Sequence, residues 1–142
     1  MQADRTKIAR QFIEGLPHCN ALGMSLSSIG EGEAEILMPY AEKLIGDPET
    51  GVIHGGAVSA LMDTCAGAAV MSHPEAGLAT ATLDLRIDYM RAAKPGATVT
   101  AHAICYHMTR SVAFVRVSAT DGTSDVPVAA ATGAFTVERG KS

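Results

Sequence analysis

The sequence predicts an α+β domain in which one long helix lies on one face of a curled antiparallel sheet. Residues 55 to about 71 are rich in small and apolar side chains and are long enough to form this central helix. Residues 80–89 then alternate apolar and polar side chains with the period of two that indicates a half-buried strand. Three more strand-like segments follow after turn residues, at 98–106, 111–120 and 126–137.

The N-terminal part of the chain is expected to add a helix and a hairpin. Residues 1–20 are predicted to be helical, with Asp4 as the cap and one apolar stripe packed on the domain, made of Ile8, Ala9, Phe12, Ile13 and Leu16. Residues 24–29 and 33–38 are predicted to pair as a hairpin around a glycine-containing turn. Residues 40–53 are predicted to be a long loop, and residues 138–142 a flexible tail.

Length and composition exclude several classes of protein. A chain of 142 residues fits one domain, so residues 1–142 are predicted to fold as a unit. The formal net charge of −4 argues against a nucleic-acid partner, which normally meets a basic face. Three cysteines without a CxxC pair predict reduced thiols and a cytoplasmic protein. Residues 4–10 are too charged for a secretory signal, and residues 55–71 are too weakly apolar for a membrane span.

Asp63 is the residue that stands out chemically, because it lies inside the apolar central helix. No Lys or Arg occurs between Leu44 and Leu85, and the helical neighbours of Asp63 at three and four residues cannot pair its charge. A carboxylate in this setting needs a partner from elsewhere in the fold or a chemical role. The residues alone leave both interpretations open.

The start of the same helix carries a second signal, His54-Gly55-Gly56. Two glycines allow a ligand to approach the backbone, and the first N–H groups of a helix point outward at the positive end of its dipole. This arrangement suits a developing oxyanion, although a helix entry that needs glycine dihedral angles would give the same dipeptide.

Other catalytic motifs are missing from the sequence. No Gly-x-Ser-x-Gly motif is present, so a serine hydrolase of the α/β type is not indicated. His102 and His107 are five residues apart on one strand and are expected on opposite faces, which argues against a metal site. Cys65 is expected to be a small buried side chain.

Two segments resemble a known family. The run from Gly51 to Ala57 (GVIHGGA), followed by Ala60-Leu61-Met62-Asp63, resembles the signature of hotdog-fold thioesterases of the phenylacetic-acid-degradation (PaaI-like) type. Residues 82–91 (TLDLRIDYMR) resemble the strand after the central helix of that family. The resemblance covers residues 22–137. It implies a hotdog fold, with a curled sheet of about five to six strands around the long helix and here an extra N-terminal helix.

The resemblance also implies an activity and four site residues. The chain would hydrolyse a fatty or aryl acyl-coenzyme A (acyl-CoA) to the free acid and CoA, without a further cofactor or metal. Asp63 would activate water or attack the thioester carbonyl, and the Gly55 N–H would bind the oxyanion. His54 would orient the thioester, and Thr82 of a neighbouring subunit would hold the attacking water.

Binding of CoA would need polar and basic residues around this centre. Asp47 stands where many relatives carry Asn; it is expected to be a turn residue, although an inward carboxylate would raise the pKa of Asp63 by like-charge repulsion. The candidate binding residues, with Arg91 and Arg110 first, are Asp47, Gly56, Arg86, Arg91, Lys94, Arg110 and Ser111.

Association of several copies is also expected. A single hotdog sheet has an exposed strand edge that dimerisation removes. The family resemblance implies at least a homodimer with active sites at its interface, and favours a homotetramer. Two other functions stay open: an acyl-thioester dehydratase or hydratase that uses His54 with Asp63, and a non-catalytic acyl-CoA-binding protein.

Overall fold

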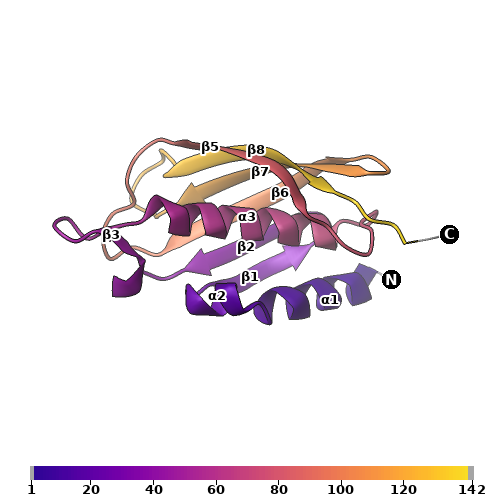
Figure 1. The fold of residues 1–142 in the computed structure, drawn as a ribbon, viewed down its shortest axis with the longest axis horizontal. Helices are drawn as coiled ribbons and strands as arrows, with labels where there is room; N and C mark the ends of the chain where they lie inside the picture. Colours follow the sequence, from indigo (N-terminus) through magenta and orange to yellow (C-terminus); the bar gives the residue numbers. More distant parts are fainter. Residues whose placement is uncertain (1, 141–142) are drawn as a thin grey trace.

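In the computed structural model, which describes residues 2–140 and the side chains from Thr6 onward, one long helix crosses one face of a six-stranded antiparallel sheet (Figure 1). The elements in chain order are α1 (Gln2–Glu14), α2 (Pro17–Ala21), β1 (Ser25–Gly30), β2 (Glu33–Met38), the 3-10 helix η1 (Glu42–Leu44), β3 (Ile45–Asp47), β4 (Val52–Ile53), α3 (Gly55–Ser72), β5 (Thr82–Tyr89), β6 (Val99–Met108), β7 (Val112–Thr120) and β8 (Ala129–Thr136). The predicted α+β class and central helix are confirmed.

The order of strands places β5 at an edge of the sheet. The strands follow one another as β1-β2-β6-β7-β8-β5, and α3 packs on β2, β6 and β7 near the middle. α1 packs beside α3 and against β1, so that it covers the opposite edge (Figure 1). β5 pairs with β8 on one side only, and its other side has no strand partner in residues 2–140.

Small side chains let α3 lie close to the sheet. The small residues Cys65, Ala66 and Ala69 are fully buried on its inner face, together with the larger Leu61 and Met62. The Cys65 thiol reaches the backbone oxygens of two strands, 3.3 Å from that of Ala34 on β2 and 3.4 Å from that of Ala101 on β6. This confirms Cys65 as a small buried side chain. Close packing of this kind favours a straight, fixed helix that can present a side chain on its outer face.

The apolar stripe of α1 is narrower than predicted. Ala9 and Ile13 are buried, whereas Ile8 is 63% and Phe12 is 55% exposed. Residues four apart lie on one helix face, so among the described side chains the buried apolar contact of α1 follows the line of Ala9 and Ile13. The helix begins two residues before the expected cap Asp4, whose side chain lies outside the described part.

The segment predicted to be a long loop contains local structure instead. Residues 40–53 include η1 and a small hairpin of β3 and β4. Gly51 has a φ of +80°, which few other residues adopt, and its carbonyl accepts a hydrogen bond from the Tyr40 hydroxyl at 2.6 Å. The hairpin therefore leads the chain into α3 along a defined path.

β-Bulges change which side chains face the core. A register shift between Thr82 and Asp84 interrupts the predicted alternation of β5, and Leu83 is 56% exposed. A second shift, between Cys105 and His107 on β6, corrects the prediction for the histidines. His102 pairs with Ser118 and His107 pairs with Phe114, so both histidines face the side of the sheet away from α3.

The expected C-terminal tail is partly tied to the domain. Its first residue, Glu138, forms a β-bridge with Ala79, while Lys141 and Ser142 lie outside the described residues. In residues 2–140, no helix combines the length and the hydropathy that crossing a membrane requires. In the same range, no group of three or more His, Cys, Asp or Glu side chains is arranged to hold a metal ion.

Candidate active site

Asp63 and Thr82 meet on the outer side of α3. The Thr82 hydroxyl donates a hydrogen bond of 2.7 Å to Oδ1 of Asp63. The Asp63 carboxylate is exposed, and within the described side chains it has no cationic partner and no donor to its second oxygen. One oxygen is therefore fixed in direction while the other stays free to accept a proton or to contact a ligand.

The contact corrects the expectation that Thr82 comes from a neighbouring subunit. Thr82 and Asp63 belong to one chain, because β5 begins beside the middle of α3. β5 then runs back toward the start of the helix, where its last residue, Tyr89, reaches Gly55. The strand and the helix thus lie antiparallel, side by side.

The start of α3 leaves one N–H group free. His54 is the N-cap, and its Nδ1 accepts a hydrogen bond of 2.8 Å from the Gly56 N–H. The Ala57 N–H donates to the His54 carbonyl at 3.0 Å. The Gly55 N–H has no acceptor within residues 2–140, so it is the donor open to a ligand. The Gly56 N–H is therefore occupied, and a role of Gly56 in substrate binding stays a prediction.

The end of η1 and strand β3 hold His54 in this position. The His54 N–H donates to the Leu44 carbonyl at 2.7 Å. Gly46 passes so close that a Cβ at that position would lie 2.7 Å from the His54 Cα. His54 therefore orients the helix start through its cap, and its Nδ1 is already used.

Tyr89 is a site residue that sequence reasoning missed. Its place in the alternation of residues 80–89 assigns it only to the apolar face of a strand. Its hydroxyl nevertheless donates to the Gly55 carbonyl at 3.0 Å and shares a hydrogen bond with Ser59. The signal available in the sequence was the polar hydroxyl at the end of an edge strand that follows the helix.

Gly55 and Asp63 are too far apart to act on one thioester within one chain. Eight residues separate them, which is about 12 Å along a helix that rises about 1.5 Å per residue. An oxyanion donor and the base or nucleophile must each lie about 3 Å from their reacting atoms. Within one chain, Asp63 with Thr82 and the Gly55 N–H therefore lie at two separate places, which we call the two half-sites.

Arg91, a first choice for CoA binding, is committed to the fold. Its guanidinium binds the two carboxylate oxygens of Asp121 at 2.8 and 2.7 Å, and its Nε donates to the Val126 carbonyl at 3.0 Å. The Asp121 carboxylate is buried, and the Arg91 guanidinium holds the pKa of Asp121 well below its usual range. The guanidinium of Arg91 therefore has no free pair of N–H groups with which to bind a phosphate. This corrects the expectation that Arg91 binds CoA.

Two more candidates make contacts of their own. Asp47 accepts hydrogen bonds from the Glu49 N–H at 3.0 Å and the Thr50 hydroxyl at 2.9 Å, which matches the turn interpretation. Arg86 pairs with Thr132 in register and faces the side of the sheet away from α3, where it contacts Asp88 at 3.4 Å. Asp63 lies on the other side of the sheet.

The remaining candidates occupy opposite ends of the sheet. The Lys94 side chain is exposed in the loop after β5, whereas Arg110 and Ser111 form the turn between β6 and β7. At that turn Arg139 donates to the Arg110 carbonyl at 2.9 Å, beside a hollow of about 380 Å³ that both side chains line. The predicted cations therefore do not form one cluster within a chain.

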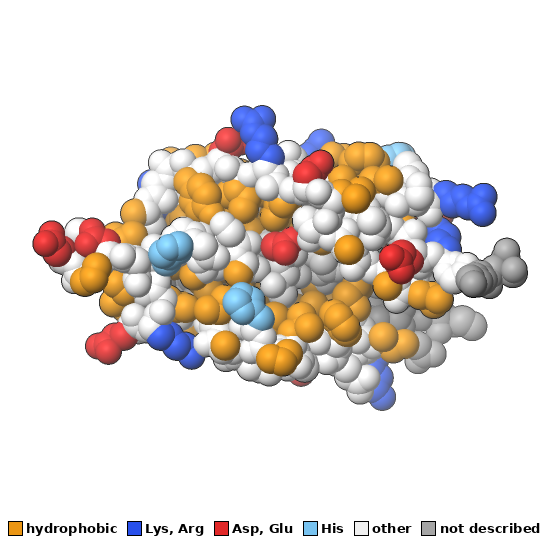
Figure 2. Space-filling model, viewed as in Figure 1, with side chains coloured by type: hydrophobic (Ala, Val, Ile, Leu, Met, Phe, Trp, Pro, Cys, Tyr) orange, Lys and Arg blue, Asp and Glu red, His pale blue; other side chains and the backbone are white. Residues whose placement is uncertain are grey.

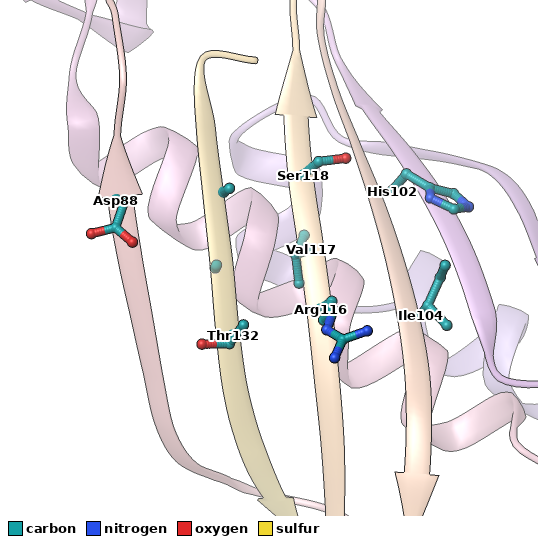
Figure 3. Close-up of a pocket in the computed structure, with 9 residues that line it drawn as sticks. Asp88, His102, Ile104, Arg116, Val117, Ser118 and Thr132 are labelled. Carbon is teal, nitrogen blue, oxygen red and sulfur yellow. The ribbon is translucent and has the colours of Figure 1, made fainter. Parts of the chain in front are cut away.

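The face of the molecule around α3 has apolar side chains on both sides of the helix, and its basic side chains lie mainly at the rim (Figure 2). A separate hollow of about 320 Å³ lies on the opposite face of the sheet, lined by Asp88, His102 and Arg116 among others (Figure 3). It faces away from Asp63 and takes no part in this site.

Cys65 does not compete with Asp63 as a nucleophile. Burial raises the pKa of the Cys65 thiol to about 12, so it stays protonated near neutral pH. Its sulfur points to the sheet, away from the solvent side of α3. Asp63 is therefore the candidate for the reacting group on this helix.

Comparison with known proteins identifies the family of this chain. The model of the thioesterase superfamily matches residues 50–128, which include the start of α3, Asp63 and β5. The chain belongs to the thioesterase superfamily. The hotdog fold expected from the sequence is thereby confirmed.

Two curated relatives of this chain are named as an esterase and a thioesterase. A Halobacterium salinarum protein, VNG_1336C, whose name assigns it provisionally to the esterases, is 31% identical and covers 96% of this chain and 94% of its own. The medium/long-chain acyl-CoA thioesterase YigI of Escherichia coli is 24% identical and covers 78% of this chain and 79% of its own.

Solved structures share the fold over nearly the whole chain. A Pseudomonas aeruginosa protein is 38% identical with a TM-score of 0.82, covering 94% of this chain and 99% of its own. The PaaI protein of the E. coli phenylacetic acid degradation operon has a TM-score of 0.86 at 24% identity, covering 99% of both chains. The similarity to PaaI proteins that the sequence indicated is confirmed.

Proposed function

We propose that this thioesterase-superfamily protein hydrolyses acyl-CoA, with Asp63 as general base or nucleophile. The observation that carries the proposal is the exposed, uncompensated Asp63 carboxylate, held by the Thr82 hydroxyl at 2.7 Å beside an apolar surface. A carboxylate with one oxygen fixed and one free suits the activation of water. The relative named as a medium/long-chain acyl-CoA thioesterase supports the substrate class.

The complete site takes residues from two copies of the chain. β5 is antiparallel to α3, with Thr82 at its start beside Asp63 and Tyr89 at its end beside Gly55 and Ser59. A twofold axis midway between Gly55 and Asp63 would pair the free edges of two β5 strands. It also places Gly55 of one copy opposite Asp63 of the other. The partner therefore contributes the oxyanion donor, and not Thr82 as the family resemblance implies.

The residues then share the work of hydrolysis. The thioester oxygen accepts the Gly55 N–H, which stabilises the negative charge that develops there. Asp63 takes a proton from a water molecule that the Thr82 hydroxyl orients, and the hydroxide adds to the carbonyl carbon. The C–S bond breaks, CoA leaves as the thiolate and is protonated, and the free acid remains. In the nucleophilic alternative, Asp63 forms an anhydride that water then opens.

The surroundings fit the two ends of the substrate. The acyl chain lies on the apolar surface beside α3, whether fatty or aryl (Figure 2). The nucleotide phosphates of CoA meet the rim, where Arg110 and Lys94 have exposed side chains. The proposal involves no further cofactor.

The dehydratase or hydratase alternative fits the geometry less well. Such an enzyme would use His54 as a base with Asp63, but Nδ1 of His54 already accepts the Gly56 N–H. Ultraviolet absorbance of an enoyl thioester distinguishes the two reactions, because hydration removes the conjugated double bond and hydrolysis does not.

Thiol release from short-chain, long-chain and aryl acyl-CoA esters tests the proposal. Wild type should release CoA, and Asp63→Asn should lose about a hundredfold or more in turnover. Retention of the wild-type rate in a folded Asp63→Asn variant would refute the mechanism. Release from no ester would favour the non-catalytic acyl-CoA-binding alternative.

Mixed dimers test the division of the site. Asp63→Asn and Gly55→Pro each inactivate every site of their own homodimer, but a mixed dimer keeps one site with Asp63 and Gly55 both intact. An equal mixture exchanged to equilibrium should regain roughly a quarter of the wild-type activity, since half the dimers are mixed. No recovery after proven subunit exchange would show that both residues act within one chain.

A further inference from the structure

We infer that Tyr89 is a positioning residue of the oxyanion site: its hydroxyl, together with Ser59, fixes the peptide group that follows Gly55. This inference rests on the proposed function of the Gly55 N–H. Tyr89 is the last residue of β5 and half exposed, and it makes these contacts across to the first turn of α3.

The start of α3 needs an external restraint. Gly55 and Gly56 stand in succession at the first two helical positions, and glycine has the least restricted backbone of all residues. A helix beginning with two glycines would fray, and a frayed N–H cannot act as a preorganised donor. Side chains from outside the helix have to supply the missing rigidity.

Hydrogen bonds hold the Gly55–Gly56 peptide group at both of its ends. Its carbonyl oxygen lies within hydrogen-bond distance of the Tyr89 hydroxyl, at 3.0 Å, and of the Ser59 hydroxyl, at 3.1 Å. Its N–H, that of Gly56, donates to His54 Nδ1 at 2.8 Å. The two hydroxyls also contact each other, and because each has one proton, they share two donated hydrogen bonds among these three contacts and act as one unit.

The restraint leaves the functional donor open. The Gly55 N–H belongs to the preceding peptide group and has no acceptor within the described part of the chain. The Tyr89 ring lies against Gly55 at ordinary contact distance, 3.8 Å from where a Cβ on Gly55 would lie. Tyr89 therefore fixes the backbone around Gly55 from the side of the edge strand and does not occupy its N–H.

The position of Tyr89 links this restraint to the proposed dimer. Tyr89 ends the strand whose free edge would pair with a second copy. The same residue thus ties the oxyanion donor to the strand that meets the Asp63 half-site of the partner. Placement of the donor relative to Asp63 across the interface then depends on the Tyr89 hydroxyl.

Tyr89→Phe tests the inference, because it removes the hydroxyl and keeps the ring. We expect kcat to fall about tenfold with KM changed less than about twofold, since one hydrogen bond to the donor peptide is lost. Ser59→Ala should act in the same direction, and the double variant should lose less than the product of both. Tyr106→Phe, on the opposite face of the sheet beside Arg116, is the matched control and should keep wild-type kinetics.

Amide hydrogen exchange at Gly56 reports on the start of α3 separately from the overall stability of the protein. In Tyr89→Phe the Gly56 amide should exchange faster, while the unfolding midpoint and the exchange of inner α3 amides stay as in wild type. An unchanged Gly56 exchange rate, or an unchanged kcat in an active enzyme, would overturn the inference and leave the proposed function standing. A wild type that hydrolyses no thioester would overturn the proposed function itself, and the inference with it.

Discussion

Thr82 donates its hydroxyl to Asp63 within a single chain, at 2.7 Å, where the edge strand β5 begins. The contact joins the one acidic side chain of α3 to the strand that follows it. Because both residues belong to one half-site, the chemistry of Asp63 can be altered through Thr82 without touching the helix.

Two replacements of Thr82 distinguish the effect of its hydroxyl on turnover from the effect of its side-chain volume. Thr82→Val removes the donor to Asp63, and we expect turnover to fall about ten- to a hundredfold, because hydrogen bonds to charged groups are the stronger ones. Thr82→Ser keeps the hydroxyl and should stay within about threefold of wild type. Thiol release at saturating acyl-CoA measures both, and equal rates for the Val and Ser variants would exclude a role for the hydroxyl.

Gly55 permits a substitution that removes only the N–H. Gly55 is the first helical residue, a position where proline is favoured, and His54 before it has the extended backbone that precedes proline (φ −64°, ψ 135°). Gly55→Pro should therefore fold while losing about a hundredfold or more in kcat. Gly55→Ala is the control, because it keeps the N–H and its Cβ meets nothing closer than 3.8 Å.

Circular dichroism and thermal unfolding should give similar curves for the two Gly55 variants. A Gly55→Pro enzyme with the activity of Gly55→Ala would show that this N–H does not bind the oxyanion. A loss of activity in both variants would instead point to the lack of a side chain at Gly55 as the essential feature.

The central helix and its Asp63 could be predicted because the sequence features that indicate them lie next to one another in the chain. The apolar run, its glycines and Asp63 are adjacent in sequence, and the helix Gly55–Ser72 follows from them. The small hairpin before α3 and the narrow contact of α1 depend on packing, which periodicity alone does not describe. Sequence thus predicted the segments whose hydrophobic pattern matches their burial in the fold.

The errors concern relationships between distant segments. One extra residue in β6 turns His107 to the same face as His102, and a bulge of this kind leaves no clear mark in a sequence. The sequence gives no sign that Arg91 is paired, because its partner Asp121 lies thirty residues later in the chain. That Thr82 reaches Asp63 of its own chain depends on where an edge strand starts relative to the helix.

Arg110 and Arg86 should differ in their effect on substrate binding. Arg110 lies at the rim, so Arg110→Ala should raise KM for acyl-CoA about three- to tenfold with kcat little changed. Arg86 lies on the side of the sheet away from α3 and Asp63, so Arg86→Ala should leave KM unchanged. Acyl-pantetheine, which lacks the nucleotide, should show no difference between Arg110→Ala and wild type. An equal effect with both substrates would exclude contact with the CoA phosphates.

The Arg91–Asp121 pair should make stability depend on acid pH. Arg91 lowers the pKa of Asp121 in the folded protein, whereas an unfolded Asp has a pKa of about 3.9. The pair's contribution is therefore complete above about pH 4 and is lost as the pH falls from there toward the folded pKa. Asp121→Asn should lower the unfolding midpoint by several degrees at pH 7, and the gap to wild type should narrow below pH 4.

The exposed Asp125 of the same loop provides the control for Asp121, because Asp125→Asn removes a charge without breaking the Arg91 contact. Urea unfolding at pH 7, 5, 3 and 2 and at fixed protein concentration measures all three proteins. Asp125→Asn should follow wild type throughout. A constant gap between Asp121→Asn and wild type at every pH would mean that Asp121 stabilises the loop through its hydrogen-bond geometry and not through its charge, since only the charged form is titrated away in acid.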